Sequence, residues 1–422
     1  LFEYREVNDD GLKGGKCKPA CTIFNITGDE TKSPRGFIEL LNSYQNNVLE
    51  LDKNSKDIFE SCFLCTNCVD VCPNDLPTDM IIEQVRADLA TKFGITWWKR
   101  IFFFLLRNRK IMDIMAYFGY VFQSCGLKIN KEKEYATPRF TLPIIKKNRF
   151  IPFAKRISFL NKYNENIESE NAKQKVAIFI GCMANYAYTS TGDALVKVLK
   201  HLNIDILIPK KQLCCSAPAY FTGDFDSTDY LIKENIKYFE TFIDDVDAII
   251  IPEATCSAMI KEDWERYLYK QKDWQERARN IKSKIFLSSY WLHKYTNLQD
   301  MLDKQSIKSN NTITYHDPCH ARKVQGVYKE PRSLLSSAYK IEEMSNSNVC
   351  CGFGGVTIQS EKYELAEKAG KLKSDMINNT KANIVSAECS ACRLQITNSL
   401  ELSKSQVTFK SPIELIAKSL RL

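Results

Sequence analysis

The chain has 422 residues, which is long enough for several domains with full hydrophobic cores. Its formal net charge of +8 is mild for this length, and basic residues are mixed with acidic ones, so we expect no nucleic-acid partner. The 16 cysteines stand at motif spacings with no secretory signal ahead of them. This pattern excludes a small extracellular disulfide scaffold and favours a cytoplasmic location.

Residues 1–93 are predicted to form helices separated by cysteine loops. Ser33 followed by Pro34 is a helix-start signal, and a second amphipathic run follows Thr78. Residues 62–73, CFLCTNCVDVCP, fit the C-x2-C-x2-C-x3-C-P run of bacterial ferredoxins, whose first three thiolates bind one 4Fe-4S cluster. A structural zinc site is the alternative. The complete run with its proline favours the cluster, so we predict a helical ferredoxin-like 4Fe-4S domain.

A second ferredoxin run, upstream of the first, is incomplete. On the same spacing, Gly11 and Gly14 stand where the first two thiolates should be, ahead of Cys17 and Cys21. Two-cluster ferredoxins exchange their fourth cysteines. One complete cubane would therefore have four protein ligands, namely Cys21, Cys62, Cys65 and Cys68. Cys17 and Cys72 would remain as ligands of a second cubane, which we expect to be absent or labile.

Residues 94–172 are predicted to form a helical insert followed by a linker. Residues 94–124 mix aromatic, aliphatic and basic side chains, but their longest apolar run, Ile101 to Leu106, is too short to span a membrane. Packing against neighbouring elements is the preferred interpretation. Peripheral contact with the inner face of the cytoplasmic membrane is the alternative, which charge reversal of Lys99 and Arg100 would weaken. Cys125 has no partner by spacing and is predicted to be a buried structural thiol.

From residue 173 onward, short apolar strands alternate with helical stretches, which is typical of α/β units. The cysteines repeat along this part at a spacing of 136 or 137 residues, pairing Cys182 with Cys319, Cys214 with Cys350, Cys215 with Cys351 and Cys256 with Cys392. We therefore predict an α+β multidomain protein whose last part is a duplicated α/β domain, with copies at 173–308 and 309–422. The cysteines should converge beyond the carboxyl ends of the strands.

The two copies differ in their cysteines. The second has five, namely Cys319, Cys350, Cys351, Cys389 and Cys392. The first has four, namely Cys182, Cys214, Cys215 and Cys256. Glu253 stands at the position of Cys389. His316 and His320 flank Cys319 and could bind a metal or donate protons, although helix capping or a hydrogen bond to a cluster sulfur is an equal alternative.

Cys350-Cys351-Gly352, with an upstream cysteine and a downstream C-x2-C, resembles the cysteine-rich CCG domain of heterodisulfide reductase. The resemblance implies that the five cysteines of the second copy hold a non-cubane iron-sulfur cluster. The first copy reads Cys214-Cys215-Ser216, which makes such a cluster doubtful there. Another cluster type, zinc or free thiols remain open for that copy.

The order of two ferredoxin runs, a helical insert and two such domains resembles the iron-sulfur subunit of glycolate oxidase. It is similar as well to subunits of anaerobic glycerol-3-phosphate dehydrogenase and of lactate-utilisation systems. The supporting motifs are residues 33–36, SPRG, residues 316–320, HDPCH, and residues 392–396, CRLQI.

This resemblance implies an electron-transfer subunit that serves a flavin-containing dehydrogenase subunit oxidising glycolate or D-lactate. Quinone or another electron carrier would accept the electrons. Substrate chemistry is assigned to the partner chain, and no catalytic residue is assigned here. The alternatives are a thiol/disulfide redox subunit like heterodisulfide reductase and a zinc-stabilised scaffold.

Overall fold

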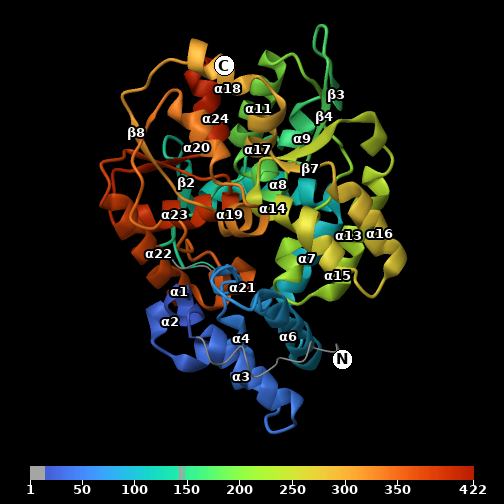
Figure 1. The fold of residues 1–422 in the computed structure, drawn as a ribbon, viewed down its shortest axis with the longest axis vertical. Coiled ribbons are helices and arrows are strands. Elements are labelled where there is room, and N and C mark those ends of the chain that lie inside the picture. Colours follow the sequence, from blue (N-terminus) through green and yellow to red (C-terminus); the bar gives the residue numbers. More distant parts are fainter. Residues whose placement is uncertain (1–14, 142–144, 146–147) are drawn as a thin grey trace.

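The computed structural model describes residues 15–141, 145 and 148–422. Gly11 and Gly14 lie outside the described residues. A small helical module occupies one end of the molecule, and two α/β lobes stand side by side above it (Figure 1). The mixed helical and α/β architecture predicted from the sequence is confirmed.

The helical module is built around one core, which includes Phe37, Leu41, Phe59 and Ile82. Its elements are α1 (Cys17–Ala20), α2 (Thr22–Thr27), η2 (Glu30–Lys32), α3 (Pro34–Gln45), α4 (Lys53–Glu60), α5 (Asn67–Asp70) and α6 (Thr78–Phe93). The predicted start of α3 is confirmed, because Ser33 Oγ accepts a hydrogen bond from Gly36 N at 3.0 Å. This cap fixes the helix that packs behind the cysteine loops.

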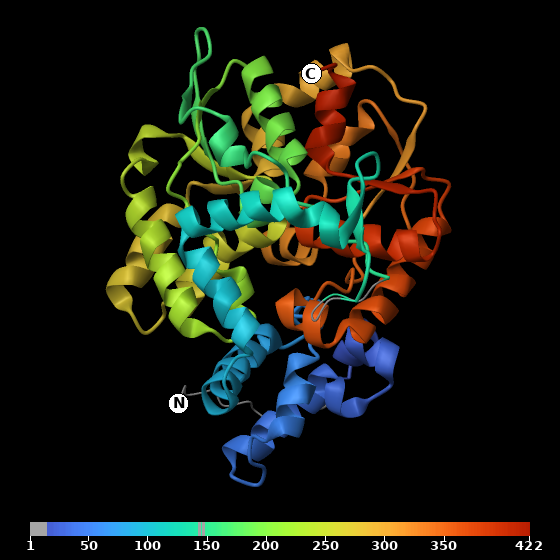
Figure 2. The same cartoon turned by 180° about the vertical axis from the view of Figure 1, so that it is seen from behind.

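The insert runs across the back of both lobes (Figure 2). Its elements are α7 (Trp97–Arg107), α8 (Arg109–Gly126), β1 (Leu127–Asn130), β2 (Tyr135–Pro138), α9 (Phe159–Lys162) and β3 (Asn166–Ile167). β1 and β2 form an antiparallel hairpin, and β3 joins the sheet of the first lobe. The segment predicted as a linker therefore carries regular structure. Among the described residues, none of the helices has the length and hydrophobicity needed to cross a bilayer.

The first α/β lobe contains a five-stranded sheet in the order β3-β5-β4-β6-β7, parallel except for β3. Its strands are β4 (Lys175–Ile178), β5 (Asp205–Leu207), β6 (Ala248–Ile251) and β7 (Ile285–Leu287), besides β3. Its helices are α10 (Cys182–Tyr186), α11 (Thr189–His201), α12 (Ala217–Tyr220), α13 (Phe225–Phe239), η3 (Ile243–Asp245), α14 (Ala254–Ala258), η4 (Met259–Asp263), α15 (Trp264–Tyr267), α16 (Lys272–Lys282), α17 (Ser288–Tyr295) and α18 (Leu298–Gln305).

The second α/β lobe contains a four-stranded parallel sheet in the order β11-β10-β8-β9. Its strands are β8 (Thr312–Tyr315), β9 (Lys340–Ile341), β10 (Ile384–Ser386) and β11 (Thr408–Lys410). Its helices are α19 (Cys319–Gln325), α20 (Glu330–Ser336), α21 (Gly355–Glu361), α22 (Tyr363–Asn378), α23 (Ser390–Leu402) and α24 (Pro412–Ser419).

The two lobes repeat one topology. Strands β4, β5, β6 and β7 occur in the same spatial order as β8, β9, β10 and β11. A central strand that is covered on both faces is apolar along its whole length, as in β6, where every residue is buried. The lobes share a core and pack α11 against α24. This arrangement aims the carboxyl ends of β4, β6, β8 and β10, each followed by a cysteine, toward the centre of the molecule.

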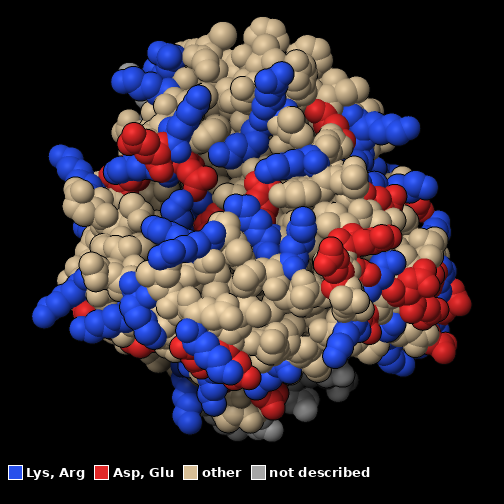
Figure 3. All heavy atoms as spheres, turned by 90° about the horizontal axis from the view of Figure 1, so that it is seen from above, with Lys and Arg blue, Asp and Glu red and all other residues tan. Residues whose placement is uncertain are grey.

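The surface seen from above carries Lys and Arg side chains over most of the face, with Asp and Glu side chains among them (Figure 3). The acidic side chains gather most densely toward one side of this view, and basic ones stand among them. Basic and acidic residues, which are mixed along the sequence, therefore also lie among one another on this face.

Candidate metal centre

Four cysteines of the helical module line one cavity, namely Cys21, Cys62, Cys65 and Cys68. Two segments far apart in sequence supply them, and Asn67 joins these segments by donating a hydrogen bond to Ala20 O at 2.9 Å. Burial raises the pKa of Cys21 to about 12 and that of Cys62 to about 11. Buried thiols in this arrangement need a bound cation to ionise. The donor set fits a 4Fe-4S cubane, which takes one thiolate for each iron.

Cys17 and Cys72 do not line this cavity. Burial raises the pKa of Cys17, and Cys72 raises it further, which indicates that these two thiols lie near each other. The structure thus separates the six ferredoxin-type cysteines into a group of four and a pair.

The five cysteines of the second lobe gather beyond the carboxyl ends of β8, β9 and β10. The sulfurs of Cys351 and Cys392 lie 3.4 Å apart. Hydrogen bonds with Cys350 and Cys392 lower the pKa of Cys351 to about 5, and a hydrogen bond with Cys392 lowers that of Cys389 to about 6. Burial opposes ionisation of Cys319, but the adjacent His320 lowers its pKa. Hydrogen bonds with Cys351 raise the pKa of Cys350 and of Cys392 well above the usual value. Three of the five thiols are therefore poised to ionise, as metal ligands must be.

The four cysteines of the first lobe gather at the equivalent end of their sheet. Gly181, with φ of +72°, brings the chain so close to Cys256 that an added Cβ would lie 3.0 Å from its sulfur. A hydrogen bond with Cys214 raises the pKa of Cys182 well above its usual value. A hydrogen bond with Cys215 lowers the pKa of Cys256, but burial together with the nearby Cys182, Glu253 and Cys214 raises that pKa to about 11. The two cysteine sets therefore differ in electrostatic environment as well as in number.

A cavity of about 200 Å³ lies between the two sets. Thiols of both lobes line it, namely Cys182, Cys215 and Cys256 from the first and Cys319, Cys350, Cys351, Cys389 and Cys392 from the second. Phe63, Phe102, Phe221 and Phe353 make much of the remaining wall apolar. Because of the duplication, cysteines of both lobes line one shared cavity.

The protein families that match this chain agree with this architecture. Residues 176–261 and 313–397 match the cysteine-rich CCG domain, and residues 12–76 match the 4Fe-4S dicluster domain. The chain is 31% identical over 233 residues to lactate utilization protein A of Bacillus cytotoxicus, covering 54% of this chain and 92% of the relative. The chain belongs to the CCG-domain iron-sulfur protein family. The resemblance noted in the sequence and the expectation of iron-sulfur clusters are confirmed.

Two further relatives of this CCG-domain protein are named as subunits. It is 26% identical over 422 residues to the probable glycolate oxidase iron-sulfur subunit of Bacillus subtilis, covering 94% of this chain and 91% of the relative. It is 33% identical over 345 residues to one subunit of the fumarate reductase (CoM/CoB) of Methanothermobacter marburgensis, covering 81% of this chain and 57% of the relative. The chain spans about 60% of the length of several curated relatives.

Glu253 serves the second lobe of this CCG-domain protein, a role that sequence reasoning missed. Its carboxylate accepts a hydrogen bond from Ser390 N at 2.6 Å and another from Ser390 Oγ, at the first turn of α23. Reciprocally, Glu388 accepts hydrogen bonds from Ser289 N at 3.0 Å and from Ser288 Oγ at the first turn of α17. Each lobe therefore caps a helix of the other, and no spacing rule signals such a contact.

The ferredoxin loop of the helical module meets the second CCG site directly. A hydrogen bond with Cys350 raises the pKa of Cys65 well above its usual value. Lys323 Nζ donates to Cys65 O and to Asn348 O, both at 3.3 Å, and so joins the two loops. Phe63 and Cys350 belong to one buried core. The two predicted cluster sites are therefore adjacent, and Cys65 of one site contacts Cys350 of the other.

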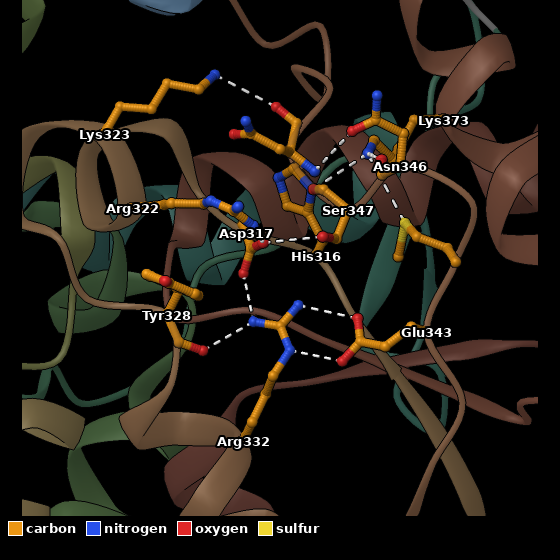
Figure 4. A network of polar contacts seen from close by, with 12 residues as sticks. His316, Asp317, Arg322, Lys323, Tyr328, Arg332, Glu343, Asn346, Ser347 and Lys373 are labelled. Carbon is orange, nitrogen blue, oxygen red and sulfur yellow. Dashed lines mark hydrogen bonds and ion pairs between the residues drawn. The ribbon is translucent and has the colours of Figure 1, made fainter. Parts of the chain in front are cut away.

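The two histidines of the HDPCH motif have different surroundings in the CCG-domain fold. His316 lies in a polar network with Ser347 and Lys373 (Figure 4), and burial together with Lys373 lowers its pKa well below the usual range. His320 stacks on Phe221 with ring centroids 5.6 Å apart. Although burial opposes protonation, Cys319 raises the pKa of His320 to about 9.

Two expectations about the insert are corrected. Cys125 was expected to be buried, but it is exposed, because α8 lies on the surface and has no buried residue. Lys99 is buried, pairs with Glu361 at 2.9 Å and donates to Thr357 Oγ1 at 3.0 Å. Its charge reversal would disrupt the fold and cannot test a membrane contact. Arg100, the other residue of that test, is exposed.

Proposed function

We propose that this chain is the iron-sulfur electron-transfer subunit of a complex whose flavin-containing partner subunit oxidises a 2-hydroxy acid, glycolate or D-lactate. Quinone or another electron carrier is the proposed acceptor. The names of the relatives from Bacillus support this assignment. Iron-sulfur clusters, when bound, pass one electron at a time, so the two-electron oxidation belongs to the partner's flavin.

The contact between Cys65 and Cys350 carries the proposal. In this scheme Cys21, Cys62, Cys65 and Cys68 hold a cubane, and the five cysteines of the second lobe hold the CCG cluster. The four cysteines of the first lobe hold a cluster of another type, zinc or no metal. Phe63 and Cys350 belong to one buried core, which joins the first two sites. The chain thus presents a short route between two one-electron sites.

Metal analysis of the anaerobically purified chain is the first test. We expect iron and acid-labile sulfide, with two spectroscopically distinct clusters in a redox titration followed by electron paramagnetic resonance. Magnetic coupling between the two signals is expected because their ligands touch. Zinc in place of iron would overturn the proposal. Recovery of the chain from its source with a flavin-containing dehydrogenase would support the assigned partner, and recovery with a thiol-handling enzyme alone would contradict it.

A second candidate function rests on the cavity lined by thiols of both lobes. We infer that it could admit a small disulfide, which would take two electrons and two protons and leave as two thiols. The test is to add hydroxyethyl disulfide to the dithionite-reduced, desalted chain. Stoichiometric thiol release with reoxidation of the chain would favour this candidate, and unchanged spectra would favour electron transfer alone.

We also propose that α7 and α8 bind the surface of an anionic membrane. Their exposed apolar side chains are Trp97, Ile101, Phe104, Ile111, Ile114, Met115, Tyr117, Phe118, Val121 and Phe122. Asp113 is the only acidic residue between 97 and 126, and it pairs with Arg109 at 2.9 Å. Arg100 and Lys110 are exposed beside this face. Aromatic and aliphatic side chains flanked by basic ones suit the headgroup region of an anionic bilayer.

A further inference from the structure

His316 is held at the carboxyl end of β8 with one ring nitrogen engaged. Its backbone N donates to Ser386 O at 2.9 Å, and its side chain is buried. Its Nδ1 lies 3.2 Å from Ser347 O. A carbonyl oxygen can only accept a hydrogen bond, so Nδ1 carries the proton. In the neutral ring, Nε2 then presents a lone pair and no proton.

That Nε2 atom is buried and has no hydrogen-bond partner among the residues that the structure describes. Its lone pair cannot be satisfied by another acceptor, and a buried polar atom without a partner is unfavourable. The ligand atoms of His316, Cys351 and Cys392 all lie within 4.8 Å of one another. One nitrogen and two sulfur donors therefore lie close together, and backbone hydrogen bonds from His316 N to Ser386 O and from Asp317 N to Ser347 O fix the chain at this position.

The first lobe provides an internal comparison. Its residue three positions before the first CCG cysteine is Phe179, where the second lobe has His316. Phe179 is buried and packs edge-on against Phe239, with ring centroids 5.9 Å apart. An apolar ring fills this position in the first lobe, so the fold itself does not require a histidine there.

We propose that His316 Nε2 is a direct iron ligand of the second CCG site, beside the thiols of Cys351 and Cys392. The hydrogen bond from Nδ1 to Ser347 O orients the ring, as second partners of metal-bound histidines do. This inference rests on the proposed cluster at that site. It adds a nitrogen donor to a set that the cysteine pattern describes as thiolate alone.

The test uses protein with ¹⁵N-labelled histidine, and its readout is pulsed electron paramagnetic resonance of the second-site cluster. Iron analysis comes first, because missing iron at this site would show that the cluster proposal itself fails. With iron present, we expect a strong nitrogen hyperfine coupling that changes with the isotope. His316→Phe, which installs the residue of the first lobe, should remove the coupling. The chain has four histidines, and His201→Phe and His320→Gln should both retain it.

His316→Cys is the second variant. It offers a thiolate in place of the nitrogen, so we expect it to keep the iron content, lose the nitrogen coupling and lower the midpoint potential, since histidine ligands raise cluster potentials relative to cysteine. Full iron with no strong nitrogen coupling in the unmodified chain would overturn the proposal. Coupling that survives in His316→Phe would do the same.

Discussion

Glu253 lies where the internal repeat would have a fifth cysteine, but its carboxylate faces the second lobe. It accepts hydrogen bonds from Ser390, next to Cys389, and Thr255 Oγ1 lies 3.5 Å from the Cys389 sulfur. Ala254 N donates to Glu388 O at 2.9 Å on the other side of that cysteine. Residues 253–255 of the first lobe therefore fix the position of the Cys389 loop. The first site has a glutamate in place of a thiol, and this glutamate helps to position a cysteine of the second site.

Glu253→Ala should destabilise the chain by about 1–3 kcal/mol, since it leaves the first turn of α23 without its buried acceptor. Glu253→Gln keeps an acceptor for Ser390 N and should lose less. Urea unfolding of the metal-free chain measures both effects without reference to activity. Equal stability of Glu253→Ala and the parent chain would show that the cap is dispensable.

Cys350→Ser should abolish the cluster spectrum of the second lobe and leave the cubane of the helical module. The substitution removes one of five proposed ligands and the contact with Cys65. Cys215→Ser, in the adjacent cysteine pair of the first lobe, should change the spectrum less. Electron paramagnetic resonance of the reduced variants separates the two sites, and equal losses would show that Glu253 and the missing thiol are immaterial.

Gly11→Cys with Gly14→Cys should restore a second cubane beside Cys17 and Cys72. Both glycines lie outside the described residues, so this prediction rests on the sequence alignment alone. The double variant should gain about four irons and a second, interacting cubane signal, because each iron takes one thiolate. Two interacting cubanes in the unchanged chain would show that the alignment is wrong.

Helix α23 connects the second site to three other parts of the fold. Arg393 is buried in this helix and pairs with Glu134 of the hairpin at 2.6 Å and with Glu414 of α24 at 3.1 Å. Glu414 also accepts a hydrogen bond from Ser190 of the first lobe. One guanidinium thus joins the insert, both lobes and the helix that carries Cys392.

Arg393→Met should cost about 3–5 kcal/mol, because it leaves the largely buried Glu414 carboxylate without its ion-pair partner. Burial opposes ionisation of Glu414, but Arg393 together with the hydrogen bonds from Ser190 Oγ and Ser411 N outweighs it and lowers the pKa of Glu414 from 4.5 to about 2. The ionised form therefore contributes about 3 kcal/mol, complete above pH 4.5 and lost as pH falls toward 2. Urea unfolding between pH 6 and pH 2 should show this loss, and Glu414→Gln should flatten it.

The α7–α8 face should bind anionic vesicles and should not bind neutral ones. Phe118→Ser with Phe122→Ser removes two exposed rings of α8 and should weaken sedimentation with phosphatidylglycerol vesicles, as should Arg100→Glu. Val48→Ser is the matched control, since Val48 is 80% exposed in the helical module. Unchanged binding of the α8 variant would contradict the membrane assignment, and a change in oligomeric state would point to a second copy as the occupant.

At the scale of the whole molecule, the sequence predicted the pattern of repeats better than the contacts between them. Cysteine spacing located both lobes because one strand order is used twice, and Ser33 and Pro34 marked a helix start by local capping chemistry. Local patterns could not place Lys99 in a buried ion pair or Cys125 on the surface, since both depend on which side of the insert the lobes cover. The cap from Glu253 and the contact of Cys65 with Cys350 likewise arise only from packing between distant segments.

Arg86 and Gly223 hold the helical module against the first lobe. The Arg86 guanidinium donates to Cys62 O at 2.7 Å in its own module and to Phe221 O at 2.9 Å in the lobe. Gly223 has a φ of +87°, and an added Cβ would lie 2.5 Å from Arg86 O. Gly223→Ala should therefore combine backbone strain of about 1–3 kcal/mol with a clash at this boundary. Differential scanning calorimetry should show a lower melting temperature, and an unchanged transition would mean that the boundary is loose.

Gly354 makes the same kind of close approach to Phe63 from the second lobe. The helical module is thus packed closely against both lobes, with no space for a side chain at either point. Many redox proteins carry electrons on a domain that swings between docking positions, and their rates fall as the solvent viscosity rises. A module held against both lobes cannot swing, so its donor and acceptor keep one fixed separation. Electron transfer within this chain should proceed at the same rate in buffer and in concentrated glycerol.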